Sequence, residues 1–342
     1  MPGTGLLDSE LPIVAAPMAG GPTTVALAAA ARAAGAFPFL AAGYKSAEAF
    51  GEELRRRREI GGAFGVNLFV YGREALDEGA FRTYAEELEP EAAHHGVELD
   101  PEPVIGDDDQ WSEKLALLVA DPVPVVSLTF GLPDVADIAS LHRAGSRVLA
   151  TVTTAGEART ARDAGVDGLV VQAPGAGGHS GTYDPRRSLT AVSARDLLRE
   201  VRAAVDLPII VGGGVADARD VRVLLRAGAE AVAVGTLLLR TDESGASRTH
   251  KDALADPAYT ETTITHAFTG RPARGLRNGF IDRHEATAPY GYPAIHHLTR
   301  PLRQAAAKAG DPERLHLWAG TGYRAARTGP AGEVIRGLAE GL

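Results

Sequence analysis

The residue best suited to acid–base chemistry is His179, in the segment VVQAPGAGGHSG that spans residues 170–181. Four glycines within residues 175–181 free this segment of side-chain bulk, so a flat ligand can approach its backbone closely. A histidine titrates near neutral pH, so its neutral ring can remove a proton and its protonated ring can stabilise an anion. We predict that His179 is a catalytic base; the alternative is a surface histidine in a flexible turn.

Two glycine turns further along the chain have the composition of a phosphate site. Residues 212–214 are three consecutive glycines, and residues 234–236 read Val-Gly-Thr. Glycines let backbone N–H groups reach an anion before the next helix begins. A tight turn explains either cluster alone, whereas the pair, at neighbouring strand ends, favours the phosphate of a sugar, a nucleotide or a flavin. The expected contacts come from Gly213, Gly214, Gly235 and Thr236.

Other polar or adaptable side chains also follow apolar runs. Asn67 and Gln172 carry carboxamides, which need hydrogen-bond partners when buried and match the donors and acceptors along a flavin edge. Thr129 is placed similarly. Met18 follows the first run and is equally compatible with a core position.

Composition excludes several classes of protein. With no cysteines, the chain cannot form disulfides, iron–sulfur clusters or thiol nucleophiles, so redox chemistry requires a bound cofactor. A net charge of -9 disfavours nucleic acid and anionic membranes as partners. His94 and His95 lie in the acidic insertion, His142 in a predicted helix, and the His296–His297 pair lacks carboxylates at ligand spacing, so no metal site is expected. The N-terminus lacks a signal-peptide pattern and no apolar run reaches membrane-spanning length, which predicts a cytoplasmic protein.

The elements that must position these residues alternate regularly along the chain. Short apolar runs, rich in β-branched residues, are separated by longer Ala-rich amphipathic stretches, as in parallel strands covered by crossover helices. This pattern predicts an α/β fold, a (β/α)8 TIM barrel. An open doubly wound sheet would need neither eight evenly alternating units nor glycine loops after both the seventh and the eighth strand. The predicted strands span residues 12–18, 37–43, 63–70, 123–131, 147–153, 168–173, 208–214 and 231–239.

Two segments do not fit the repeating unit. Residues 71–121 are strongly acidic and are predicted to form a helical insertion after the third strand, covering one side of the barrel with a solvated face. The expected domains are a barrel over residues 1–255 and a C-terminal segment of loops and helices over 256–342, packed across the barrel mouth. Three aromatic residues of this segment could wall the pocket or belong to the core: Phe280, Tyr290 and Tyr292.

The sequence resembles the nitronate monooxygenases, formerly called 2-nitropropane dioxygenases, over almost its whole length. The motifs that carry this likeness are PIVAAPMAG, FGVNLF, VVQAPGAGGHSG, PIIVGGGVAD, AVAVGTLLL, AFTGRPARGLRNGF and LHLWAGTGY. That family is similar in fold to the flavin-dependent enoyl-acyl-carrier-protein reductases. Two positions depart from its pattern, since Gly175 stands where a Glu is usual and Ala173 where a Gly is usual.

The resemblance implies flavin mononucleotide (FMN) as cofactor, with His179 facing the substrate. The positions that match the family's cofactor-binding motif are Ala16, Pro17, Met18, Asn67, Gln172, Gly177, Gly178, Gly213, Gly214, Gly235 and Thr236. The expected activity is oxidation of alkyl nitronates or nitroalkanes with dioxygen.

Two other activities remain open. One is an FMN reductase that uses NAD(P)H to reduce an enoyl thioester, a quinone or a natural-product intermediate. The other is a flavin-binding barrel without catalysis, which the missing carboxylate at Gly175 keeps under consideration. A small molecule is the expected partner, and either the acidic insertion or the C-terminal helices could form an interface in a homo-oligomer.

Overall fold

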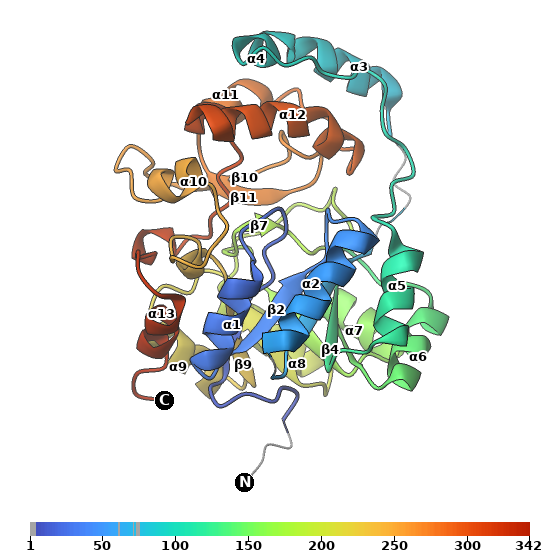
Figure 1. The fold of residues 1–342 in the computed structure, drawn as a ribbon, viewed down its shortest axis with the longest axis vertical. Helices are drawn as coiled ribbons and strands as arrows, with labels where there is room; N and C mark the ends of the chain where they lie inside the picture. Colours follow the sequence, from blue (N-terminus) through green and yellow to red (C-terminus); the bar gives the residue numbers. More distant parts are fainter. Residues whose placement is uncertain (1–4, 61, 71, 73–75) are drawn as a thin grey trace.

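The computed structural model describes residues 5–60, 62–70, 72 and 76–342. Its centre is a closed barrel of parallel strands in which β1 pairs with both β2 and β9. Helices surround the strands, and a further layer of the chain lies above one end (Figure 1). The predicted (β/α)8 barrel is therefore confirmed. Its strands are β1 (Ile13–Ala15), β2 (Phe37–Ala41), β3 (Gly65–Phe69), β4 (Val125–Thr129), β5 (Arg147–Val152), β6 (Gly168–Gln172), β8 (Ile209–Gly212) and β9 (Ala231–Val234).

Each barrel strand lies inside its predicted range but is shorter. The last range, 231–239, shows why, because β9 ends at Val234 and a short 3-10 helix, η1 (Thr236–Leu238), follows at once. Beyond its last paired residue each strand turns away from its neighbours at the barrel mouth. The apolar stretch of sequence continues there, although the hydrogen bonds between strands have ended. The residues after the ladder form the rim of the site.

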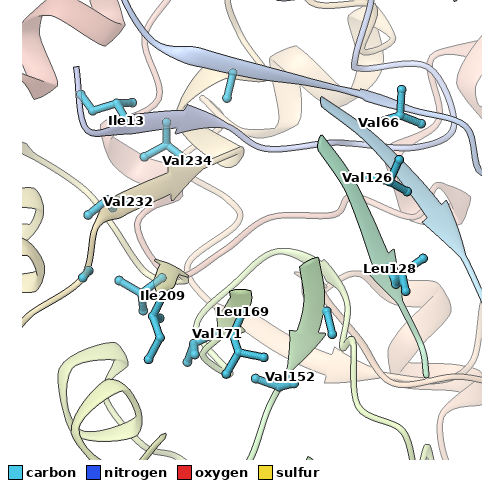
Figure 2. Packing of buried hydrophobic residues seen from close by; sticks show 14 of the residues in the cluster. Ile13, Val66, Val126, Leu128, Val152, Leu169, Val171, Ile209, Val232 and Val234 are labelled. Atoms are coloured by element: carbon cyan, nitrogen blue, oxygen red, sulfur yellow. The ribbon is translucent and has the colours of Figure 1, made fainter. Parts of the chain in front are cut away.

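Alternation along the strands separates two cores. Val126 and Leu128 of β4 face the helices and join the core between barrel and helices, part of which is shown in Figure 2. Val125 belongs instead to a cluster that includes Phe39 and Ile210 of other strands. Ser127 follows two residues after Val125, so this face of β4 turns polar toward its carboxyl end.

A ring of helices surrounds the barrel. Contacts between neighbours link α13 to α1, α1 to α2, α2 to α5, α5 to α6, α7 to α8, α8 to α9 and α9 to α13. Side-chain caps fix the start of several of them, such as Thr154 before α7 and Asp217 before α9. The ring consists of α1 (Val25–Ala33), α2 (Ala47–Ile60), α5 (Trp111–Ala120), α6 (Val135–Ala144), α7 (Ala155–Asp163), α8 (Ala194–Ala204), α9 (Ala218–Arg226) and α13 (Ala331–Leu338).

The segment between η1 and α13 covers the barrel mouth, as predicted for the C-terminal extension (Figure 1). The last helix, α13, also lies in the predicted range of 256–342 but packs on α1 and α9 in the ring. Its small antiparallel sheet, in the order β10-β11-β7, incorporates two residues of the glycine-rich loop as β7. The elements of this cover are α10 (Arg248–Ala253), β10 (Thr262–Thr265), β11 (Ala273–Leu276), α11 (Gly279–His284), α12 (Ala294–Ala309), η2 (Pro312–Arg314) and η3 (Tyr323–Ala325), together with β7 (Gly178–His179).

The insertion after β3 is helical, but its position differs from the prediction. Of its helices, α5 packs on α2 and α6 of the ring, whereas α3 (Glu78–Glu87) and α4 (Glu89–His94) lie on the cover, above α11 and α12 (Figure 1). Phe81 and Tyr84 of α3 share an apolar cluster with Phe268 and Phe280. The acidic composition of the insertion predicted that its surface is exposed to solvent. It did not reveal that α3 also has an apolar face, which is buried against the cover.

Within the described ranges, no helix combines the length and the apolar character that a membrane crossing requires.

Candidate active site

A cavity of about 630 Å³ opens at the carboxyl ends of the barrel strands and extends beneath α12. Its size lies within the range of small-molecule and cofactor sites. Every residue that the sequence singled out for the site lines this one cavity: Ala16, Pro17, Met18, Asn67, Gln172, Gly177, Gly178, His179, Gly213, Gly214, Gly235 and Thr236.

The two glycine turns present free backbone donors to the cavity. Among the described residues, the N–H groups of Gly213, Gly214, Val215, Gly235 and Thr236 have no hydrogen-bond partner in the protein. Gly213 has φ +121°, and a Cβ there would lie 2.7 Å from the carbonyl oxygen of Ala173, so only glycine fits. Unsatisfied donors at the ends of two neighbouring strands suit an anion such as phosphate.

A third glycine segment, from the far end of the sequence, completes this side of the cavity. Gly320 donates its N–H to the hydroxyl of Thr236 at 2.9 Å, and both Gly320 and Gly322 line the cavity. A Cβ on Gly177 would lie 2.5 Å from the nitrogen of Gly320, so the two backbones touch. The motif LHLWAGTGY contains these residues, but only the fold shows that they meet the other turns.

The same segment explains what occupies the space at Gly175. The N–H of Thr321 donates to the carbonyl of Gly175 at 3.0 Å. A Cβ on Gly175 would lie 3.0 Å from the Thr321 hydroxyl and 3.3 Å from the nitrogen of Gly214. Close packing against these two residues therefore replaces the side chain that the family pattern usually has.

His179 is held on both sides of its backbone. It pairs with Ala273 in the antiparallel contact of β7 with β11, so the loop is not a flexible turn. Gln172, at the end of β6, donates from its amide to the carbonyl of His179 at 3.0 Å and accepts from the N–H of Gly181 at 2.6 Å. We expected Gln172 to contact a ligand, and the structure adds a positioning role.

The ring of His179 has a defined hydrogen-bond partner. Its Nε2 lies 2.9 Å from the Thr269 hydroxyl, which donates to the carbonyl of Arg271 at 3.2 Å. Because that hydroxyl proton is committed, Thr269 accepts from Nε2, and the network assigns the ring proton to Nε2. Nδ1 is therefore the basic nitrogen, and among the described residues it has no protein partner.

The surroundings of His179 favour its neutral form. Its ring packs 5.8 Å from that of Phe130 and 5.6 Å from those of Tyr292 and Trp318, between centroids. Burial, with the positive charges of Arg271 and Arg303, lowers its pKa from 6.5 to about 3. The neutral ring suits a base, but the expectation that protonated His179 stabilises an anion does not fit this site.

Asn67 has one end committed to the barrel. Its amide nitrogen donates to the hydroxyls of Ser127 and Thr129, both at 2.9 Å. No described residue donates to its carbonyl oxygen, which is left as an acceptor in the cavity.

The three aromatic residues of the cover have different surroundings. Phe280 is fully buried and stacks on Phe268 with centroids 4.4 Å apart, so it is a core residue. Tyr290 stacks on His266. Tyr292 contacts the His179 ring, although none of the three belongs to the cavity lining.

One group of potential metal ligands occurs in the described residues, formed by His94, His95 and Asp311. An oxygen of Asp311 already contacts His95 at 3.0 Å and Arg314 at 2.9 Å. Asp311 therefore already has a cationic partner in Arg314, and none of these residues lines the cavity.

An eight-stranded α/β barrel with paired glycine turns and a half-buried histidine at its mouth defines a class of enzymes that bind phosphate-bearing ligands at the strand ends. Residues 5–341 match the family model described as nitronate monooxygenase, and the chain belongs to that family. The protein is accordingly an oxidoreductase, which excludes a barrel without catalysis.

Individual relatives agree with this assignment. Probable nitronate monooxygenases of several Staphylococcus aureus strains, including Newman and MRSA252, are 33% identical over 340 residues, covering 98% of this chain and 95% of theirs. The nitroalkane oxidase of Streptomyces ansochromogenes has a similar structure, with a TM-score of 0.92 and 48% identity over 97% of this chain and 95% of that one. FabK from Thermotoga maritima, at 23% identity and a TM-score of 0.75 over 97% and 93% of the chains, shares the fold.

Proposed function

We propose that this enzyme oxidises alkyl nitronates, or nitroalkanes once His179 has removed their α-proton, with bound FMN as cofactor and dioxygen as electron acceptor. The observation that carries the proposal is the placing of His179, whose Nε2 contacts Thr269, in the same cavity that the glycine turns line. Family membership and the similarity to a nitroalkane oxidase support a nitro compound as substrate.

The fit of FMN is supported by the donors at the glycine turns. The N–H groups of residues 213–215 and 235–236 would hold its phosphate, and Asn67 would offer its carbonyl oxygen to the flavin edge. When bound, the flavin accepts electrons from the substrate and passes them to dioxygen. Ala16, Met18 and Gly235 would flank it, since a Cβ built on Gly235 would lie 3.4 Å from the Met18 sulfur and 3.6 Å from the Ala16 Cβ.

The protein's own residues account for the proton transfer. Gln172 and β11 fix the backbone of His179, and Thr269 holds the ring proton on Nε2, so Nδ1 can accept the α-proton of a nitroalkane. The rings of Phe130, Tyr292 and Trp318 pack around this histidine and restrict the positions that its ring can take. A nitronate has already lost this proton, so it bypasses this step.

The experiment combines a spectrum with a turnover comparison. The purified protein should show flavin absorbance, and His179→Asn should keep the flavin while losing most turnover of nitroethane. Its turnover of ethyl nitronate should fall less, because no α-proton is removed. Absence of flavin would contradict the proposal, and undiminished nitroethane turnover would remove His179 from the mechanism. Rapid anaerobic bleaching by NADH or NADPH would instead favour the reductase alternative.

A further inference from the structure

The cavity has a cationic lining although the chain carries a net charge of -9. Lys45, Arg300 and Arg303 line it, and its described lining contains no aspartate or glutamate. Lys45 already forms an ion pair, at 2.5 Å, with Glu53, which does not line the cavity. The arginines therefore supply positive charge that no carboxylate in the lining balances.

Both arginines lie on one face of α12. The residues of this helix that line the cavity are His296, Arg300, Arg303, Gln304 and Ala307. Apart from the adjacent Arg303 and Gln304, they recur at intervals of three or four residues, as on a single helical stripe, so one face of α12 presents polar groups to the cavity. Arg300 is exposed at the rim, whereas only 5% of Arg303 is accessible.

Arg303 is a buried cation with neutral protein partners only. Its Nε donates to the Thr299 hydroxyl at 3.0 Å, and its Nη2 donates to the carbonyl of His296 at 2.9 Å. No carboxylate of the described residues lies within 4.0 Å of it, and its Nη1 has no protein partner there. A buried charge without a counterion is costly, so its position at a cavity indicates a binding site for an anion.

His296 offers a second donor beside it. Its Nδ1 accepts from Nη2 of Arg303 at 3.2 Å, so the ring proton lies on Nε2, which has no partner among the described residues. The ring stacks on Tyr44 with centroids 4.2 Å apart, and Tyr292 donates to the Tyr44 hydroxyl at 3.1 Å. These contacts fix the ring in a neutral, donating state.

The two donors are near the catalytic base and away from the glycine turns. The ring of Tyr292 lies 5.6 Å from that of His179 and 6.3 Å from that of His296. Tyr44 follows β2, whereas the glycine turns follow β8 and β9, which lie on the other side of β1 in the barrel order. Arg271 also affects His179, but it stacks over Phe130 and does not line the cavity.

We propose that Arg303, with His296 beside it, binds the paired oxygens of the nitronate group and makes the enzyme prefer the anionic nitronate over the neutral nitroalkane. This inference rests on the proposed function for its substrate. The guanidinium fork matches a planar group with two oxygens, and its charge stabilises the anion more than the uncharged nitro group.

The test measures anion binding separately from turnover. Propionate has the planar, two-oxygen anionic head of ethyl nitronate and cannot be oxidised in its place, so its dissociation constant is measured with the flavin-loaded enzyme by calorimetry. Arg303→Gln should weaken propionate binding roughly 10- to 100-fold, the loss expected for hydrogen bonds to a charged group. Arg303→Lys, which keeps the charge but not the fork, should fall between. The matched control is Lys308→Gln, which removes an exposed positive charge from the same helix outside the cavity lining.

Turnover then tests the preference. In Arg303→Gln, KM for ethyl nitronate should rise, and the ratio of kcat/KM for ethyl nitronate to that for nitroethane should fall about as much as propionate affinity. Unchanged propionate binding in Arg303→Gln, or no binding to the wild type, would overturn the anion site. Arg303-dependent propionate binding without any nitro-compound turnover would keep the anion site and reject the proposed function. If Arg303→Gln loses its flavin, Arg303→Lys carries the test.

Discussion

The Nε2 atom of His179 lies 2.9 Å from the hydroxyl oxygen of Thr269, and this contact joins the barrel to the segment that covers it. Thr269 is buried and belongs to the TGRP motif before β11. The imidazole of His179 therefore has a defined hydrogen-bond partner in Thr269. Removing this hydroxyl should change which ring nitrogen carries the proton.

Replacing Thr269 with Val should reduce proton abstraction. The variant leaves Nε2 without an acceptor, so kcat/KM for nitroethane should fall roughly tenfold or more, as expected for one buried hydrogen bond. Thr269→Ser should retain activity within about twofold, because the hydroxyl remains. Steady-state kinetics check this, with flavin content and melting temperature as controls. Equal activity of the Val and Ser variants would reject the assigned tautomer.

Acid should destabilise the cofactor-free protein through its buried histidines. Burial lowers the pKa of His179 to about 3 and that of His250 to about 4, from 6.5. Below pH 6.5 these histidines bind protons in the unfolded chain but stay neutral in the folded protein. Their contribution to the free energy of unfolding is therefore fully present above pH 6.5 and is lost as the pH falls toward 3. Each such histidine should lower the free energy of unfolding by roughly 1.4 kcal/mol per pH unit below about pH 6.

Urea unfolding at pH 7, 6 and 5 measures this slope. His250→Gln should flatten it, whereas replacement of His94, an exposed histidine, by Gln should not. Equal slopes for wild type and His250→Gln would show that His250 does not become protonated on unfolding in this range.

Restoring the family's usual residue at Gly175 should impair cofactor binding. A Cβ there meets the Thr321 hydroxyl at 3.0 Å and Gly214 at 3.3 Å, so Gly175→Glu must displace one of the phosphate-side segments. Overpacking of this kind should raise the dissociation constant for FMN roughly tenfold. Adding Thr321→Ala should recover part of the affinity. Titration of the cofactor-free protein with FMN measures both effects, and tighter binding by Gly175→Glu would contradict this explanation.

Glu91 should be essential for attaching the insertion to the cover. Its carboxylate contacts Nε of Arg283 at 2.6 Å, Nε2 of His284 at 2.9 Å and Nε of Arg314 at 2.6 Å. Burial alone would raise its pKa, but these partners lower it to about 2. The ionised Glu91 carboxylate therefore stabilises the folded protein above about pH 4.5, and this contribution is lost as the pH falls toward 2.

Glu91→Ala removes a buried carboxylate from Arg283, whereas His284 keeps Glu87 at 2.6 Å and Arg314 keeps Asp311 at 2.9 Å. The loss of hydrogen bonds to a charged group should destabilise the protein by roughly 1.5 to 3 kcal/mol. Hydrogen exchange of α4 should accelerate more than that of the barrel strands, because the contact holds α4 on α11. Glu86→Ala, an exposed neighbour on α3, serves as the control. Uniform exchange changes, or none, would show that Glu91 does not hold this interface.

Sequence alone determined the barrel and half of the site. Eight apolar runs separated by amphipathic stretches specify parallel strands and their order, and the residues directly after each strand lie at the same end of the barrel. That rule placed His179, Asn67 and the glycine turns in one cavity without any knowledge of distances. The residue types at the strand ends were sufficient to predict a shared site, because a barrel brings the ends of all its strands together.

The contacts of the cover were decided only by the tertiary structure. Arg303 and Thr269 lie roughly 90 to 120 residues after His179 and act on its surroundings because the cover folds back over the mouth. One signal for Arg303 existed, since it follows the apolar Leu302 on the buried side of α12, where a charged residue is unusual. Helical periodicity shows that such a face is buried but not what it faces, and only the path of the chain determined that α12 faces the cavity.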